Sequence, residues 1–213
     1  MALRRKQKPT ERSKLDATPP WEERTREQPH ATTGPYDERD APVDDVLRAD
    51  LGALRVPVGP GLDLRVEVND AQQVVAATLA GPEGTMQLGV FAAPRNEGIW
   101  DEVRAEIEES LNSQQGRAKE RAGGAFGTEL TGTIPAEGGR LPVRFIGVDG
   151  PRWFLRAMLV GDAADPQKGS RLEQALAQVV VVRGTEPLPV REAVPLQLPK
   201  EVELPGDEGT VTT

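Results

Sequence analysis

The sequence contains no cysteine and a single histidine, His30. Cysteine and histidine supply the best thiol nucleophile, the commonest general base and the commonest metal ligand in proteins. His30 lies in a segment rich in proline and charge, which we expect to stay unfolded. A packed site must therefore use carboxylates, hydroxyls, lysine or arginine, and none of these lies in a recognisable catalytic motif. The sequence predicts a protein that is not an enzyme.

Long apolar runs are also absent. No stretch approaches 18 apolar residues, so we expect no membrane span. The basic N-terminus is not followed by the apolar segment of a secretory signal, and we expect a cytoplasmic protein. The net charge of −8 argues against a nucleic-acid module, because binding to phosphates needs a basic surface. The expected partner is another protein.

The motifs that hold cofactors are missing as well. Gly59-Pro60-Gly61 has no Lys-Ser or Lys-Thr after it, so it predicts a turn and not a phosphate cradle. The acidic residues between positions 37 and 50 lack the spacing of a calcium loop. No serine lies in a nucleophile elbow. We therefore expect no cofactor and no metal, and a carboxylate-based enzyme is the least favoured alternative.

Composition divides the chain into three parts. Residues 1–42 form a basic-to-acidic leader that we expect to be disordered, with Trp21 and Tyr36 as the natural anchors if it binds a groove. Residues 43–184 are rich in aliphatic residues and predict one domain, of a size that buries a stable core. Residues 185–213 form an acidic, proline-rich tail. The first sixteen residues carry a net charge of +4, and residues 185–213 carry −4.

Hydrophobic periodicity predicts six strands and two helices within 43–184. Residues 43–56 predict a short helix or docking segment, and residues 112–124 a polar loop. In the last helix, the β-branched run from Val179 to Val182 can instead form a strand. The predicted strands are 62–68, 74–79, 86 to about 94, 126–134, 141–148 and 153–160, and the predicted helices are 99–111 and 169–182.

The order is three strands, a helix, three strands and a helix. Short hairpins connect the strands, so the pairing should be mainly antiparallel. This predicts an α+β fold with a six-stranded sheet and two helices, which cover one face together or one face each.

The hairpin from Val143 to Val160 carries the candidate interaction residues Arg144, Arg152, Trp153 and Arg156. If the turn centres near Gly150, Arg144 and Arg156 lie nearly opposite each other on one face. Like charges in that arrangement need an acid or a bound anion.

Two interpretations follow for this hairpin. In the first, Glu129 on the preceding strand completes a structural ion-pair cluster. In the second, the arginines bind an anion or a partner. Trp153 and Phe154 point to opposite faces, so we expect one in the core and the other exposed. An exposed aromatic beside arginine has the composition of a protein-interface hot spot.

Residues 43 to about 199 resemble a family of uncharacterised actinobacterial domains of unknown function. The resemblance rests on Gly-Pro-Arg-Trp-Phe-Leu-Arg at 150–156, the turn at Gly161-Asp162, the segment 179–184 and Pro-Leu-Pro-Val-Arg-Glu at 187–192. The element order is also similar to the PsbP-like α/β/α sandwich, which implies a binding or assembly factor. A protein-binding or assembly module is thus the first hypothesis, and a small-ligand or anion-binding domain that uses Arg144 and Arg156 is the second.

Overall fold

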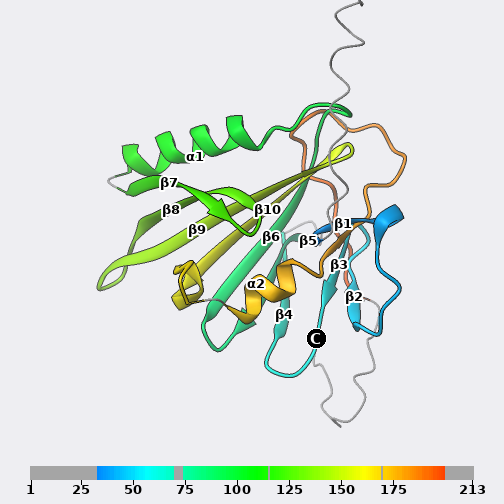
Figure 1. Cartoon of the computed structure of the whole chain (residues 1–213), viewed down its shortest axis with the longest axis horizontal. Coiled ribbons are helices and arrows are strands. Elements are labelled where there is room, and N and C mark those ends of the chain that lie inside the picture. The colour runs from blue at the N-terminus through cyan, green and yellow to red at the C-terminus, as the bar shows by residue number, and fades with distance from the viewer. Residues whose placement is uncertain (1–32, 70–73, 115, 169, 200–213) are drawn as a thin grey trace, which may run out of the picture.

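The computed structural model describes residues 33–69, 74–114, 116–168 and 170–199, and these form two sheets with two α-helices (Figure 1). The spatial order of the large sheet is β4 (Asp63–Val68), β5 (Val74–Gly81), β6 (Gly84–Ala92), β10 (Trp153–Gly161), β9 (Gly139–Gly150), β8 (Gly127–Ala136) and β7 (Arg117–Gly124). The small sheet has the order β1 (Tyr36–Asp37), β11 (Val180–Val181), β3 (Leu54–Pro57) and β2 (Arg48–Asp50). The α-helices are α1 (Trp100–Ser113) and α2 (Arg171–Leu176), and 3-10 turns cover Glu38–Asp40 and Asp162–Ala164.

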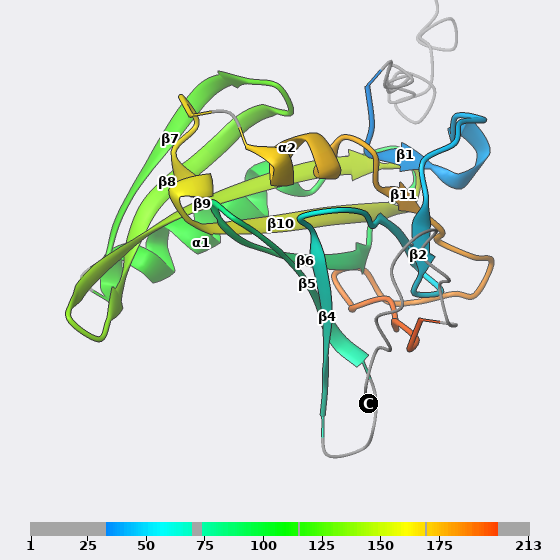
Figure 2. The same ribbon diagram turned by 90° about the horizontal axis from the view of Figure 1, so that it is seen from below.

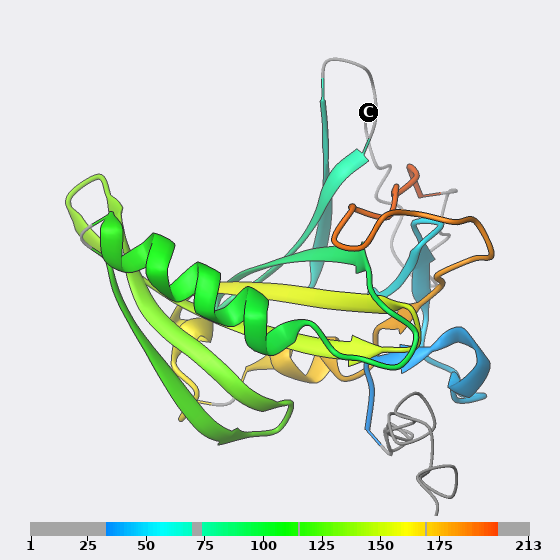
Figure 3. The same ribbon diagram turned by 90° about the horizontal axis from the view of Figure 1, so that it is seen from above.

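The α+β class with mainly antiparallel pairing is confirmed. All neighbouring strands in the large sheet are antiparallel. The two helices lie on opposite faces: α1 packs against β7, β8 and β9, while α2 and the small sheet lie on the other side (Figures 2 and 3). None of the helices in the described residues is long and apolar enough to cross a membrane.

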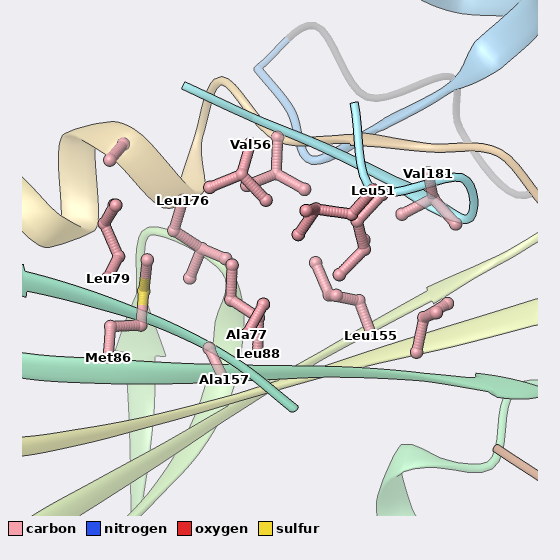
Figure 4. Packing of buried hydrophobic residues seen from close by; sticks show 14 of the residues in the cluster. Leu51, Val56, Ala77, Leu79, Met86, Leu88, Leu155, Ala157, Leu176 and Val181 are labelled. Atoms are coloured by element: carbon pink, nitrogen blue, oxygen red, sulfur yellow. The ribbon is translucent and has the colours of Figure 1, made fainter. Parts of the chain in front are cut away.

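The large sheet separates two hydrophobic cores, and alternation along β10 supplies both. Leu155, Ala157 and Leu159 belong to the larger core, on the side of α2 and the small sheet. Figure 4 shows Leu155 and Ala157 in this core. Phe154 points to the α1 side and packs in the smaller core with Trp100. Trp100 lies directly over Gly147, where a Cβ atom would be 2.2 Å from its ring. A glycine at this position therefore lets α1 approach the sheet closely.

Two predicted elements are wrong. Residues 117–124 form β7, so the sheet has seven strands and not six, and the loop expected at 112–124 is mostly strand. Residues 43–56 contain β2 and β3 in place of a helix. Leu51 and Leu54 matched helical spacing, but the chain turns at Gly52, which has a φ of +77°. This conformation favours glycine and interrupts a helix.

The C-terminal part of the predicted domain contains the strand that the sequence allowed as an alternative to the end of the last helix. The helix ends at Leu176, and Val180–Val181 forms β11, which pairs with β1 and β3. β-branched residues suit a buried strand better than the end of a helix.

Two segments outside the predicted bounds of 43–184 pack against the domain. One is β1, which lies within the predicted leader. The other comprises residues 185–199, which we call the strap. In the strap, Val194 N–H donates to Val90 O at 2.9 Å, and Gln197 N–H donates to Leu51 O at 2.8 Å.

Candidate functional site

Arg144 belongs to an ion-pair cluster between the sheet and α2. Its Nε and Nη2 donate to the two carboxylate oxygens of Glu129 on β8, at 2.9 and 2.7 Å. Its Nη1 donates to Glu173 Oε2 on α2, at 2.9 Å. Arg121 of β7 also pairs with Glu129, at 3.2 Å. The side chains of Arg144 and Glu129 are 1% and 0% exposed, so solvent does not reach their contact.

Two carboxylates hold the guanidinium of Arg144 in this cluster. Burial acts to lower the pKa of Arg144, but its hydrogen bonds to Glu129 and Glu173 outweigh that effect, and the pKa is raised. A guanidinium held by two carboxylates has no free pair of donors for another anion. Glu129 is the acid expected beside Arg144, and the arrangement favours the structural interpretation of this arginine.

Arg144 and Arg156 lie on opposite faces of the sheet, so the expectation that they face each other is wrong. The turn centres between Pro151 and Arg152, and Arg144 therefore pairs with Leu159. The residue expected opposite Arg144 was Arg156, which lies three positions before Leu159. Because side chains alternate along a strand, an odd shift in register exchanges the two faces.

Both aromatic residues of the hairpin are buried, Trp153 at 2% and Phe154 at 1% exposure. They point to opposite faces, but each face of the sheet carries a core. Trp153 Nε1 donates to Asp37 Oδ2, at the end of β1, at 2.8 Å. Phe154 stacks on Trp100 with ring centroids 5.8 Å apart. The prediction of an exposed aromatic in this pair is therefore wrong.

The other predicted interaction residues do not join Arg144 or Arg156 in one site. Arg152 occupies the hairpin turn with a φ of +67°, and its carbonyl oxygen accepts from Ala93 N–H and Arg183 Nε. Burial lowers the pKa of Arg183, and the charge of Arg152 lowers it further. Trp21 lies outside the described residues.

Among the predicted interaction residues, Arg156 is the one whose charge can still bind a partner or ligand. Its guanidinium carbon lies 5.2 Å from the centroid of the Phe91 ring, within cation–π range. The residues directly opposite it on β6 and β9 are Gly89 and Gly147, which have no side chains. Burial lowers the pKa of Arg156, and no acidic residue in the described part of the chain offsets this effect.

A pocket of about 70 Å³ lies beside Arg156, at the point where β6 changes its neighbour. β5 pairs with β6 up to Leu88, and the strap takes over beside Val90 and Ala92. The pocket opens at Gly89, between these two partners. Its walls include Ala76, Gln87, Phe91, Arg156, Val194 and Leu196.

Asp149 holds the start of α1 against the sheet. Asp149 of β9 accepts from Ile99 N–H at 2.8 Å and from Trp100 N–H at 3.3 Å. Burial raises the pKa of Asp149, and these two hydrogen bonds oppose the rise. A carboxylate at a helix N-terminus also interacts favourably with the helix dipole.

The variant Asp149→Asn should gain stability relative to the wild type as the pH rises. The pKa of Asp149 is raised above its ordinary value of 3.8 in the folded chain, so folding favours the protonated form. The contribution of this group to stability is therefore complete below pH 3.8 and falls as the pH rises through the folded pKa. Urea unfolding of both proteins at a series of pH values measures the difference, and a difference that does not change with pH would contradict the raised pKa.

The fold and the site define an α+β domain with an arginine-containing pocket at the junction between a sheet and its C-terminal strap. The chain belongs to the family described as "Protein of unknown function (DUF3710)", which matches residues 34–204. Membership of a family of unknown function was expected and is confirmed; the actinobacterial origin and the PsbP-like similarity stay predictions.

Comparison with individual proteins adds little to the family assignment. No curated protein matches the chain. A crystal structure of a protein from Bacteroides thetaiotaomicron VPI-5482 is similar at a TM-score of 0.41 and 15% sequence identity. The similarity covers 64% of this chain and 48% of the other, so the chain spans about half the length of that structure.

Proposed function

We propose that this protein is a cytoplasmic, non-enzymatic module that binds another protein. Its binding surface is the part of the α1-side sheet face that α1 leaves uncovered, which we call the open face. α1 packs over β7, β8 and β9, and no helix of the described chain lies over β4 and β5 on this side (Figure 3). Half-buried side chains of the open face are Thr78, Gln87, Phe91, Arg156 and Met158.

The observation that carries this proposal is the pairing of Arg156 with Phe91. Arginine and aromatic residues dominate the energetics of protein interfaces when they are partly buried and surrounded by polar groups. Arg156 already has part of its hydration removed, so a partner that supplies a negative group loses less free energy on binding. By contrast, the guanidinium of Arg144 is buried and already paired with two carboxylates, so it is not accessible to a partner.

The variant Arg156→Gln should lose its partner without losing stability. We expect the immobilised full chain to capture one stoichiometric protein from a lysate of the source cells, identified by mass spectrometry. The amount captured by the variant should fall by about tenfold or more, because a hydrogen bond to a charged group contributes about 1.5–3 kcal/mol.

The matched control is Arg55→Gln. Arg55 lies on β3 of the small sheet, on the other side of the large sheet, and it pairs with Glu38 away from the pocket. This variant removes the same charge and should capture as much protein as the wild type. The melting temperatures of all three proteins should agree. Equal capture by Arg156→Gln and the wild type would contradict the proposed surface.

A further inference from the structure

The pocket beside Arg156 presents a charged group that the fold does not neutralise. The guanidinium has lost part of its water and has the Phe91 ring as its described electrostatic contact. A ring quadrupole offsets only part of the cost of removing a cation from water. An anion in the pocket would offset the rest, because the interaction of opposite charges strengthens as water is excluded.

The walls of the pocket select among anions. A single guanidinium matches the planar fork of one carboxylate, with two parallel hydrogen bonds. Apolar residues also line the pocket, among them Ala76 from β5 and Val194 and Leu196 from the strap. A phosphate carries more charge and more oxygen atoms than one arginine and Gln87 can satisfy. The lining therefore suits a carboxylate that is carried on an apolar stem.

The size of the pocket limits the stem. A volume of about 70 Å³ has room for a few groups of the size of water or methyl. The absence of a side chain at Gly89 contributes to this space, because a Cβ atom there would lie 3.2 Å from the Phe91 ring. Gly89 lies in the middle of β6, so its main effect on this face is to leave room beside Arg156.

We infer that this pocket binds a carboxylate on a short aliphatic stem, anchored by Arg156. The group has two sources, a free short-chain carboxylic acid or a glutamate side chain of a partner protein. This inference deepens the proposed function, because it names the chemical group that the open face recognises.

The test is a titration of the full chain followed by NMR of the Gln87 and Gly89 backbone amides and the arginine Nε–H signals. The probes are propionate and the capped tripeptide Ala-Glu-Ala, which carries the same stem. Propionamide and the capped tripeptide Ala-Gln-Ala are their neutral counterparts. We expect saturable shifts with an acidic probe. Its neutral counterpart should bind at least about tenfold more weakly.

Three variants locate the site. Arg156→Gln should weaken binding by about tenfold or more, because it removes the charged fork. Gly89→Ala keeps the charge but narrows the pocket, so it should also weaken binding. Arg55→Gln should bind like the wild type. Binding that is equal in Arg156→Gln and the wild type would overturn the inference, and so would the absence of binding by both acidic probes.

The outcomes separate this inference from the proposed function. Tighter binding of the acidic tripeptide than of propionate supports the inference and assigns the carboxylate to a partner protein. Binding of propionate alone supports the inference and assigns the pocket to a free acid, which contradicts the protein-binding proposal. Capture of a protein that depends on Arg156, with no response to either acid, overturns the inference and leaves the protein-binding proposal standing.

Discussion

Replacing Arg144 with methionine is expected to lower the free energy of unfolding by about 3–5 kcal/mol. The substitution leaves Glu129 as a carboxylate that is 0% exposed and has lost its bidentate partner. Arg121 remains within reach of Glu129, but its side chain is 37% exposed, so it replaces only part of the lost interaction. Unfolding in guanidinium chloride, followed by circular dichroism, measures the change.

Two further variants separate a buried charge from ordinary packing. The double variant Arg144→Met/Glu129→Leu removes both charges and should be more stable than Arg144→Met alone, because apolar residues replace a buried ion pair at little cost. Arg121→Gln should cost less than about 1 kcal/mol, as is usual for partly exposed pairs. A stability of Arg144→Met within experimental error of the wild type would show that this arginine is not structural.

Most of the large sheet could be predicted, because its strands alternate between apolar and other residues. β7 was missed because its alternation has few apolar residues: Arg117, Lys119 and Arg121 share one face. It is an edge strand, with β8 as its one neighbour among the strands that the structure describes. Charged residues on an edge strand discourage pairing with other chains, and the same composition is typical of loops. Local pattern therefore could not distinguish the two.

The small sheet could not be predicted for a different reason. Its strands are two to four residues long, too short for a periodicity to emerge. β1 pairs with β11 across most of the chain, Tyr36 opposite Val180. Pairing at such a separation is decided by the whole packed structure, since no local signal links the two segments. The predicted domain therefore began after β1.

The candidate site depended on register, which the sequence indicated only approximately. An error in the turn of the hairpin placed Arg156 on the face of Arg144, while the true pairing sets it on the other. The sequence did contain a pattern that indicates the position of its neighbour, Phe91. Met86, Leu88 and Val90 alternate toward the larger core, which places Phe91 on the opposite face of β6. That alternation predicts a partly exposed aromatic on β6, where none was expected.

Ending the chain at Gly184 is expected to lower the free energy of unfolding by about 3–6 kcal/mol. The deletion removes the strap, in which Val194 and Leu196 are each 8% exposed. Burial of an aliphatic side chain of this size contributes about 1.5–3 kcal/mol. Since whole domains are stable by only about 5–15 kcal/mol, the shortened chain should unfold at a much lower concentration of guanidinium chloride.

Ending the chain at Pro199 provides the control, because it keeps the whole strap. This variant should unfold at the same denaturant concentration as the full chain. Identical unfolding of the chain that ends at Gly184 would show that residues 185–199 contribute nothing to stability. That result would restore the predicted domain boundary at 184.

Single substitutions distinguish which contacts of the strap matter. Arg191 pairs with Glu102 and Glu106 of α1, but all three side chains are well exposed, so Arg191→Gln should change stability little. Leu196→Ala removes apolar contacts with the larger core and should cost about 2–5 kcal/mol. Because Leu196 also lines the pocket, this variant should bind propionate more weakly than Arg191→Gln does. The strap would then act both as a part of the core and as a wall of the site.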